Sequence, residues 1–505
     1  MVQSVCKESV RKVVIAGGGT AGWIAAASLS SQLGSLLDIT LIESDDIGTV
    51  GVGEATIPTH KTFHRLIGID EREFMRATRA SFKLGIAFEN WGQVGDRYIH
   101  SFGKVGRSTW MGDFQHMWHY ANSKGWCSDM DDYCLELQAA EAGKFATSEQ
   151  NQPNHTQLNY AYHLDAGLYA KFLRNFSEQR GAKRIEGKIK DVRLHPDTGY
   201  IDRLDLEDGQ SISGDLFIDC TGFRGLLING ALGVGYEDWS HWLPMNRALA
   251  VQTRVSEEIL PYTRSIAHKA GWQWRIPLQH RVGNGLVYCS DYMSDDEAHE
   301  TLMANIQGER VSDPRPIKFL TGKRHEVWSK NCVALGLSSG FLEPLESTSI
   351  HLIQIGATRL IQMFPFDGVN DALRNRYNTL SNAELESIRD FLIAHYKLNQ
   401  RQDAEFWQQR AALEVPDSLQ HRIDLYKNSA IAYQDGSDLF RVDSWNQVMR
   451  GQGLESRGYH HMGHLLADGQ LKTALADLKA QIDKMVASMP KHADFLRQYQ
   501  VFSEQ

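Results

Sequence analysis

The sequence predicts an α/β fold: a Rossmann-like βαβ module, an added antiparallel sheet and a helical C-terminal region. Three observations support this fold class. A short apolar strand runs into the pattern G-x-G-x-x-G near the N-terminus, alternating stretches suited to strands occupy the middle of the chain, and helical periodicity dominates beyond residue 370.

The N-terminal strand is the run Val-Val-Ile-Ala at residues 13–16, whose β-branched residues suit a buried parallel strand. Residues 24–33, rich in Ala and Leu, form the expected helix after it. Between them lie three glycines that fit G-x-G-x-x-G: Gly17, Gly19 and Gly22. In such a loop the glycines allow a tight turn, a close approach of backbone to a pyrophosphate, and close packing of helix on strand. The pyrophosphate rests at the helix N-terminus, where unpaired N–H groups favour negative charge.

A second strand at residues 38–42 ends on Glu43, at the distance along the chain where a ribose-binding acid is expected. Strand, glycine turn, helix, strand and acid therefore occur in the order of a dinucleotide-binding unit. A glycine-rich turn without a ligand is the alternative, and it leaves Glu43 unexplained.

Two later apolar segments are expected to join the same sheet. Residues 215–219 read DLFID and lead into a small-residue turn, and residues 333–337 enter a second turn of this kind. Both return the chain to the carboxyl edge of the sheet, where ligands bind in such folds. The nucleotide-binding module is thus assembled from distant segments.

The antiparallel sheet is indicated by alternating stretches such as residues 248–253 and 285–288. It would also contain the segment GWQWRIPLQ at residues 271–279, in which Trp272 and Trp274 share one face of a strand that ends near Pro277. Taken alone, this segment is most simply a strand whose alternate residues fill a core.

The C-terminal helical region contains apolar residues at 4-3-4-3 spacing, which is typical of a helix face that packs on a core. These residues are Leu471, Leu475, Leu478, Ile482 and Met485.

Composition limits the classes of partner. The net charge of −9 comes from 62 acidic and 53 basic residues without a basic block, which argues against nucleic acid. Six cysteines without C-x-x-C spacing indicate reduced thiols, and no apolar run reaches the ~18 residues of a membrane span. Glycines interrupt the small and apolar run at residues 13–29, which argues against an export signal. We expect a soluble, cytoplasmic protein.

Four stretches together resemble one family, the flavin-dependent halogenases of the tryptophan-halogenase type. They are GGGTAGW at 17–23, WQWRIP at 272–277, FLEPLESTS at 341–349, and SFKLGIAFENW around Lys83. The likeness covers nearly the whole chain in the right order, and the tryptophan signature is more specific than any glycine loop. The resemblance implies a flavin-monooxygenase-type module.

The resemblance also implies a reaction. FAD is delivered as FADH2 by a separate flavin reductase and forms a hydroperoxide with O2. The hydroperoxide oxidises chloride or bromide to hypohalous acid, which travels to Lys83 and halogenates an aromatic substrate elsewhere in the protein. Bulky side chains keep that substrate away from the flavin, and the residues implied in this partition are Trp272, Trp274, Ile276 and Pro277.

For the cofactor, the resemblance points to the glycine loop, the acid after the second strand, a strap at residues 50–58, and two positions near the tryptophan-halogenase motif at 341–349. The implied cofactor-binding residues are Gly17, Gly19, Thr20, Ala21, Gly22, Glu43, Val52, Gly53, Ala55, Leu337 and Ile350. A glycine-rich surface loop is the alternative for the strap.

Lys83 and Glu346 are the implied catalytic residues. Lys83 lies in an apolar strand expected over residues 82–86, where an ammonium is costly to bury without a function or a partner. By resemblance it binds hypohalous acid or forms a haloamine; burial lowers the pKa of a lysine and favours the amine. A structural, salt-bridged or snorkelling lysine is the alternative. Glu346 is implied to stabilise the cationic ring and polarise the halogen donor, although it can also cap the helix expected over residues 350–360.

The halide would lie at the start of that helix, against the N–H groups of Thr348 and Ser349. Many relatives have Gly where this chain has Ser349, so chloride and bromide both stay open. His100 and Phe102 match positions that stack on the substrate, although a core His and Phe look the same. The tyrosine pair expected of enzymes acting on free tryptophan is not matched, which favours a smaller indole or another electron-rich aromatic.

Two groups of histidines have helix-compatible spacings, His116 with His119 and the set around His460, but neither comes with a recognisable carboxylate or thiolate set, so no metal is expected. We expect residues 1–370 to form the flavin-binding module, including the tryptophan sheet, and residues 371–505 to pack on it and close the substrate site. Rival functions are a single-component flavin-dependent hydroxylase and a non-catalytic flavin-binding protein; the presence of both Lys83 and Glu346 disfavours the latter. By resemblance, a homodimer is expected.

Overall fold

The computed structural model describes residues 9–46, 53–109, 112–147, 158–255 and 258–502. By contacts the chain divides into two units. Unit 1 comprises Met1–Arg79, Leu164–Asn246 and Lys318–Leu385, and unit 2 comprises Ala80–His163, Arg247–Ile317 and Glu386–Gln505. The segment 1–370 thus contributes to both units, and the tryptophan-containing sheet groups with the C-terminal helices.

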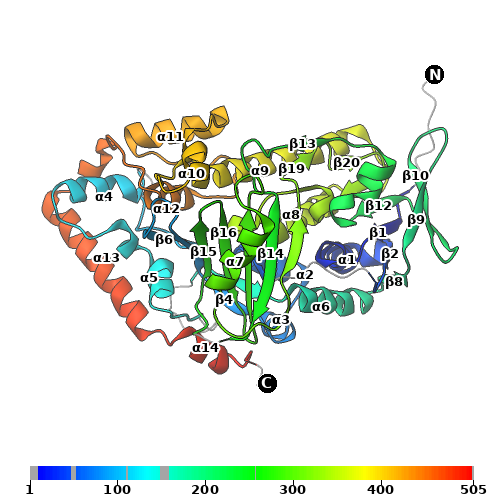
Figure 1. The fold of residues 1–505 in the computed structure, drawn as a ribbon, viewed down its shortest axis with the longest axis horizontal. Coiled ribbons are helices and arrows are strands. Elements are labelled where there is room, and N and C mark those ends of the chain that lie inside the picture. Colours follow the sequence, from blue (N-terminus) through cyan, green and yellow to red (C-terminus); the bar gives the residue numbers. More distant parts are fainter. Residues whose placement is uncertain (1–8, 47–52, 110–111, 148–157, 256–257, 503–505) are drawn as a thin grey trace. The chain divides into compact units, whose positions relative to one another are not determined.

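Unit 1 is built on a six-stranded sheet with the order β20-β21-β12-β1-β2-β8 (Figure 1). All neighbours are parallel except β20, which runs antiparallel to β21. The strands are β1 (Lys12–Ala16), β2 (Asp38–Glu43), β8 (Lys183–Glu186), β12 (Leu216–Asp219), β20 (Trp328–Ser329) and β21 (Cys332–Ala334). The predicted N-terminal strands and both later additions to the sheet are confirmed. Their apolar runs follow from burial on both faces.

Helices flank this sheet, and α1 lies against α6 and α8. Residues 22–30 of α1 are all buried, which explains why its sequence is apolar around the whole helix. The helices of unit 1 are α1 (Thr20–Leu33), α2 (Thr59–Ile67), α3 (Glu71–Thr78), α6 (Ala166–Glu178), α8 (Ser349–Gln362) and the first part of α9 (Asp371–Lys397).

Smaller elements complete unit 1. Two three-stranded sheets have the orders β11-β10-β9 and β13-β19-β22. Their strands are β9 (Ile189–Leu194), β10 (Ile201–Leu206), β11 (Ser211–Ser213), β13 (Tyr236–Asp238), β19 (Gly322–Arg324) and β22 (Gly340–Phe341). Unit 1 also contains the short strand β3 (Glu54–Ala55), which is in neither of these two sheets. Short helical turns are η1 (Gly34–Leu36), η3 (Gly222–Arg224), η4 (Leu226–Ala231), η5 (Gly336–Ser338) and η6 (Pro344–Glu346).

Unit 2 contains a seven-stranded sheet with the order β18-β14-β17-β16-β15-β5-β6. The central strands β14, β17, β16 and β15 are antiparallel neighbours, and β15 runs parallel to β5. The strands are β5 (Gly85–Glu89), β6 (Arg97–Ser101), β14 (Arg247–Thr253), β15 (Thr263–His268), β16 (Gly271–Pro277), β17 (Val282–Tyr288) and β18 (Arg315–Lys318). The predicted antiparallel sheet and the tryptophan strand are therefore confirmed.

The strand expected over residues 82–86 is interrupted. Two strands occupy its place: β4 (Ser81–Lys83), which pairs antiparallel with β7 (Ala161–Leu164), and β5, which joins the seven-stranded sheet. Between them, the N–H of Leu84 donates to the carbonyl of Pro261 at 2.7 Å. The chain changes sheets at this residue, so Lys83 is the last residue of a short, separate strand.

The remaining elements of unit 2 are helical. They are α4 (Phe114–Ser123), η2 (Met130–Tyr133), α5 (Leu135–Glu141), α7 (Asp295–Asn305), the last part of α9, α10 (Glu405–Ala412), α11 (Asp417–Ser429), α12 (Val442–Gly451), η7 (His461–His464), α13 (Asp468–Ser488) and α14 (His492–Gln498). On α13, three of the five residues of the predicted stripe, Leu471, Leu475 and Ile482, are buried, whereas Leu478 and Met485 are only half-buried.

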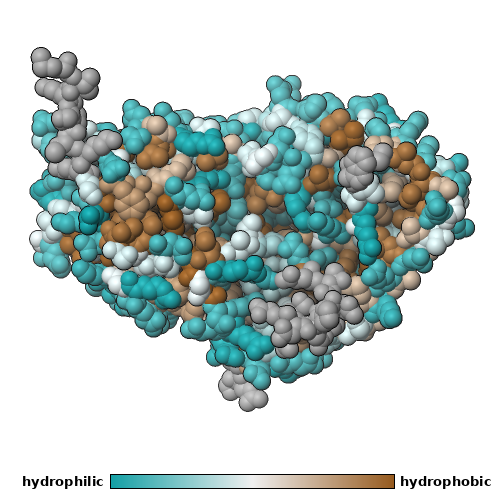
Figure 2. Space-filling view, turned by 180° about the vertical axis from the view of Figure 1, so that it is seen from behind, coloured by the Kyte–Doolittle hydropathy of each residue, from teal (hydrophilic) through white to brown (hydrophobic). Residues whose placement is uncertain are grey.

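The surface is mixed in character. Figure 2 shows hydrophobic residues on one face interrupted by hydrophilic ones, and scattered exposed apolar side chains of this kind are normal for globular proteins. None of the described helices combines the length and the apolar character that crossing a bilayer requires. The five cysteines within the described ranges are free thiols.

Candidate active site

The glycine loop of unit 1 connects β1 to α1. Gly17 has φ +101°, and a Cβ placed there would lie 2.3 Å from the carbonyl oxygen of Cys220. A Cβ at Gly22 would lie 1.9 Å from the carbonyl oxygen of Gly17, which means that α1 packs closely on the loop. A Cβ at Gly19, by contrast, would meet no described atom within 4 Å. The loop thus leaves open space at the start of α1, where Thr20 and Ala21 follow and N–H groups favour an anion.

Glu43, at the end of β2, lies directly against this loop. Its Oε1 accepts a hydrogen bond from Arg184 Nε at 2.5 Å, and its Oε2 accepts one from the indole N–H of Trp23 at 3.3 Å. A Cβ on Gly18 would lie 1.7 Å from Glu43 Oε2. A carboxylate has about four acceptor sites, so Glu43 retains capacity for a ribose hydroxyl.

Four other predicted cofactor-binding residues within the described ranges also lie in unit 1: Gly53, Ala55, Leu337 and Ile350. Leu337 lies in η5, next to Gly336, where a Cβ would come within 2.8 Å of the Ala21 side chain. Ile350 lies buried in the first turn of α8. Gly53 has φ +86°, which favours glycine, and Ala55 in β3 is buried; Val52 lies outside the described residues. The open space at Gly19 and the acceptor at Glu43 fit the adenosine diphosphate half of FAD.

The motif at residues 341–349 forms η6 and the start of α8. Glu346 is buried with 1% of its surface exposed. Ser347 follows with φ +60°, a left-handed conformation that costs energy for a residue with a side chain and often marks functional sites. The N-cap of α8 is Thr348, whose side chain makes no capping hydrogen bond. Its buried Oγ1 has no hydrogen-bond partner within the described part of the chain.

This helix start can accommodate a halide. The first backbone hydrogen bond of α8 runs from Leu352 N–H to the carbonyl of Thr348, so the amides before it lack intrahelical partners. The unsatisfied Thr348 hydroxyl adds a donor at the same end. Thr348 and Ser349 therefore fit an anion site at the N-terminus of a helix of 14 residues.

Lys83 lies in unit 2, at the end of β4, and is fully buried. Its Nζ lies 5.2 Å from the centroid of the Phe102 ring, within the range of a cation–π interaction. The structure thus brings together two of the predicted residues, Lys83 and Phe102. Lys83 pairs with Ala161 on β7.

His492, at the start of α14, holds the backbone of β4. Its Nε2 accepts a hydrogen bond from the N–H of Phe82 at 3.1 Å, and its Nδ1 bonds the carbonyl of Ile259 at 2.9 Å. Since one ring nitrogen accepts and the other faces a carbonyl, the imidazole is neutral with its hydrogen on Nδ1. Burial lowers the pKa of His492 to about 4, which is consistent with this neutral form.

On one face of the tryptophan strand β16, each tryptophan pairs with at least one small residue of a neighbouring strand. Trp272 pairs with Ala267, and Trp274 pairs with Ser265 on β15 and with Gly285 on β17. A Cβ at Gly285 would lie 2.0 Å from Trp274 Cζ2, which means that the indole lies over this glycine. Both indoles are buried, with ring centroids 6.3 Å apart. The next residue on this face is Ile276, and Pro277 ends the strand.

His100 lies on this same face, on the edge strand β6 of the seven-stranded sheet. His100 pairs with Ile86, which pairs with Thr263, and Thr263 shares a face of β15 with Ser265. Trp274 and His100 are therefore on the same face of the seven-stranded sheet. Sequence reasoning did not anticipate the aromatic residues that surround His100.

Those residues come from α9, α12 and the segment between α11 and α12. The ring of His100 lies 5.5 Å from Phe391, which stacks on Phe440 at 3.7 Å and meets Trp445 edge-on at 4.7 Å. The indole Nε1 of Trp445 is buried and has no hydrogen-bond partner among the described residues. Phe391, Phe440 and Trp445 are isolated aromatic residues in the sequence, so no local signal identified them.

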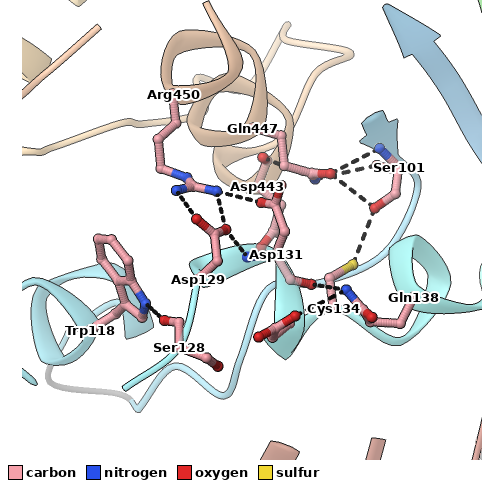
Figure 3. A network of polar contacts seen from close by, with 11 residues as sticks. Ser101, Trp118, Ser128, Asp129, Asp131, Cys134, Gln138, Asp443, Gln447 and Arg450 are labelled. Atoms are coloured by element: carbon pink, nitrogen blue, oxygen red, sulfur yellow. Dashed lines mark hydrogen bonds and ion pairs between the residues drawn. The ribbon is translucent and has the colours of Figure 1, made fainter. Parts of the chain in front are cut away.

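Helix α12 fixes the segment between His100 and Phe102 (Figure 3). Gln447 Oε1 accepts hydrogen bonds from the N–H of Ser101 at 2.8 Å and from its hydroxyl at 2.9 Å, and the Ser101 oxygen lies 3.1 Å from Cys134 Sγ. The carbonyl of Phe102 accepts from Arg441 at 2.8 Å. Side-chain hydrogen bonds therefore hold the backbone between His100 and Phe102, the two residues predicted to bind the substrate ring.

At the far end of the same helix, Arg450 binds two carboxylates of unit 2 (Figure 3). Its Nη2 donates to Asp129 at 2.8 Å and to Asp131 at 2.6 Å, and both aspartates belong to the η2 region. These ion pairs fix the C-terminal end of α12, just as Gln447 fixes its middle.

Comparisons with known proteins agree with this arrangement. The sequence model of the family described as Tryptophan halogenase matches residues 12–468. Tryptophan 6-halogenase SttH of Streptomyces toxytricini is 37% identical, over 97% of this chain and 98% of the relative. The structure of Xcc4156, a flavin-dependent halogenase from Xanthomonas campestris, superposes with a TM-score of 0.95 at 53% identity, covering 97% of this chain and 99% of that chain.

A second solved structure, BrvH, a flavin-dependent halogenase from Brevundimonas sp. BAL3, has a TM-score of 0.92 and 42% identity, covering 97% of this chain and 99% of that chain. These findings favour the halogenase over the hydroxylase and the non-catalytic flavin protein. The chain belongs to the tryptophan halogenase family and is a flavin-dependent halogenase.

Proposed function

We propose that this halogenase acts on an indole-like aromatic substrate, with Lys83 and Glu346 as its catalytic residues. The observation that carries the proposal is the complete burial of Lys83, with its Nζ 5.2 Å from the ring of Phe102. An ammonium or amine held in such a place is costly unless it serves a reaction or a partner.

The enzyme requires reduced FAD from a separate flavin reductase, dioxygen and a halide. The bound flavin, with dioxygen, supplies the oxidation of chloride or bromide to hypohalous acid. In the proposal, the glycine loop and Glu43 hold the adenosine diphosphate half, with Gly53, Ala55, Leu337 and Ile350 against the rest of the cofactor. The amides of Thr348 and Ser349 hold the halide.

Lys83 hydrogen-bonds the oxygen of hypohalous acid and holds the halogen toward one ring carbon. That carbon forms a bond to the halogen while the halogen–oxygen bond breaks, and the oxygen takes a proton from the Lys83 ammonium, which solvent later restores, and leaves as water. The ring then loses its own proton, which Glu346 accepts, so that the halogenated aromatic and water are the products.

The tryptophans have a separate role in the proposal. Trp272, Trp274, Ile276 and Pro277 form a rigid partition that keeps the aromatic substrate from the flavin, so that the halide is oxidised instead. Burial of both indoles and the tight fit of Trp274 over Gly285 support this role, because neither ring has space to move aside.

For the substrate, the proposal is an indole without an amino-acid group. SttH is named for activity on tryptophan. In this chain, however, charged groups near the aromatic residues around His100 are already paired: Arg422 with Asp438 and the carbonyl of Tyr433, and Arg441 with the carbonyl of Phe102. A charged amino-acid group would have to compete with these internal bonds, whereas a neutral ring would stack on His100 and Phe102.

The test is a competition assay with reduced FAD, oxygen and bromide, in which products from indole and tryptophan are weighed by mass spectrometry. We expect brominated indole to dominate. Faster turnover of tryptophan than of indole would reject the substrate proposal, and addition of oxygen instead of bromine would reject the role of the tryptophan partition. Repeating the assay in chloride identifies the preferred halide.

A homodimer and a cytoplasmic location also stay proposals, and both rest on the family resemblance and the composition. Sedimentation equilibrium tests the first and cell fractionation tests the second. A monomer, or recovery with the membrane or secreted fraction, would reject them.

A further inference from the structure

A buried chain of polar groups lies two residues before Lys83. The hydroxyl of Ser81 donates to the carbonyl oxygen of Pro277 at 2.6 Å, and Ser81 Oγ lies 3.2 Å from His163 Nδ1. His163 Nε2 lies 2.9 Å from the hydroxyl of Thr263. Ser81 and His163 are completely buried, and Thr263 is 5% exposed. Water therefore has little access to any of these groups.

The direction of each hydrogen bond follows from the number of hydrogens. Ser81 has one hydroxyl hydrogen and gives it to Pro277, so His163 donates from Nδ1 to the serine oxygen. His163 Nε2 then accepts from Thr263, which makes the imidazole neutral. Burial first, and the ammonium of Lys83 second, lower the pKa of His163 well below its ordinary value. The neutral histidine adds no positive charge beside Lys83.

These hydrogen bonds join four strands, β4, β7, β15 and β16. Ser81 and Lys83 share a face of β4, because alternate residues of a strand point the same way. Ser81 pairs with His163 on β7. Pro277 is the last residue of the tryptophan strand β16, and Thr263 begins β15, the neighbour of that strand. The lysine strand is thereby tied to the end of the strand that contains Trp272 and Trp274.

We propose that Ser81 and His163 are positioning residues, which hold Lys83 in register with the end of the tryptophan strand so that hypohalous acid reacts on the substrate instead of escaping. This inference rests on the proposed role of Lys83. Misplacing a reacting group by about 1 Å can cost about 100-fold in rate. A partial loss of this anchor, with β4 still paired to β7, should cost about 10-fold.

The experiment measures two quantities with reduced FAD, oxygen and bromide: brominated indole, and hypohalous acid released to solution, trapped by monochlorodimedone. For Ser81→Ala and His163→Phe we expect about 10-fold less brominated indole and more trapped oxidant, with unchanged FAD affinity. Ser81→Thr, which keeps the hydroxyl, should restore coupling. Because the two residues act as one chain, the double variant should be no worse than the poorer single variant.

The matched control is Ser177→Ala in α6, where an equally buried hydroxyl also donates to a carbonyl at 2.6 Å, that of Leu173. It should leave both quantities unchanged. Unchanged product and unchanged trapped oxidant in Ser81→Ala and His163→Phe would overturn the inference, as would a loss of product without a rise in trapped oxidant. If His163→Phe does not fold, the inference is decided by the brominated indole and trapped oxidant of Ser81→Ala and Ser81→Thr.

Lys83→Ala, run in parallel, separates this inference from the proposed function. Loss of brominated indole with continued release of oxidant supports the role of Lys83, whatever the positioning variants do. Full activity of Lys83→Ala would overturn the proposed function itself, and with it the inference about Ser81 and His163.

Discussion

The packing of Trp274 over Gly285 gives a direct test of the rigid partition. A Cβ at position 285 would lie 2.0 Å from Trp274 Cζ2 and 2.6 Å from the carbonyl oxygen of Leu249. Carbon atoms prefer separations of about 3.5 to 4.0 Å, so in Gly285→Ala the indole must move by about 1.5 to 2 Å. The backbone of Leu249 belongs to the adjacent strand β14 and cannot yield easily. Overpacking of this kind costs about 1 to 3 kcal/mol.

Two assays check this reasoning. Thermal unfolding should show a lower Tm, by about 1 °C for each kcal/mol in a chain of 505 residues. Mass spectrometry of products from indole and bromide should show less brominated and more oxygenated indole, since a displaced indole ring opens the partition. The control is Gly469→Ala in the first turn of α13, where a Cβ meets no described atom within 4 Å. If Gly285→Ala matches this control in Tm and in products, Trp274 is not tightly held and the argument for a rigid wall is wrong.

Three further predictions concern Lys83, Glu346 and His492. Lys83→Ala should abolish halogenation while FAD still binds, as measured by flavin titration. If the variant keeps most of its halogenation activity, Lys83 is not a catalytic residue. Glu346→Gln should slow bromination by about 100-fold or more, as expected for loss of a proton acceptor, whereas an unchanged rate would leave Glu346 a structural residue. Because the pKa of His492 is lowered to about 4, against about 6.5 in an unfolded chain, the unfolded chain binds more protons between these values. The stability from His492 is thus complete above pH 6.5 and lost as the pH falls toward 4. Denaturant unfolding measures the free energy of unfolding at pH 7.5 and at pH 5. Between these pH values it should fall by about 2 kcal/mol more in the natural chain than in His492→Gln. An equal fall in both would contradict a neutral His492 in the folded protein.

Local features of the fold could be predicted from the sequence because short segments determine them. The glycine loop is one case: Gly17 needs a positive φ and Gly22 permits close packing, and both requirements act within a few residues. The tryptophan strand is another, since its alternation and terminal Pro277 indicate a strand without knowledge of its neighbours.

Contacts between distant segments could not be predicted in this way. The pairing of Arg184 with Glu43 spans 141 positions, and that of His492 with Phe82 spans 410. The sequence around Arg184 and around His492 contains no local pattern from which the partner of either residue can be predicted. The same limit explains the strand expected over residues 82–86, because its break at Leu84 depends on a hydrogen bond to Pro261. The division into units also follows contacts rather than chain order.

The bond from His492 to Phe82 has a consequence for biosynthesis. The lysine strand β4 is translated before His492, the acceptor for the N–H of Phe82, which lies 410 positions later in the sequence. At a rate of about 5 to 20 residues per second, a ribosome needs about 20 to 80 seconds to cover that distance. A polypeptide that has not yet reached residue 492 therefore lacks the side-chain acceptor for this backbone donor of the lysine strand.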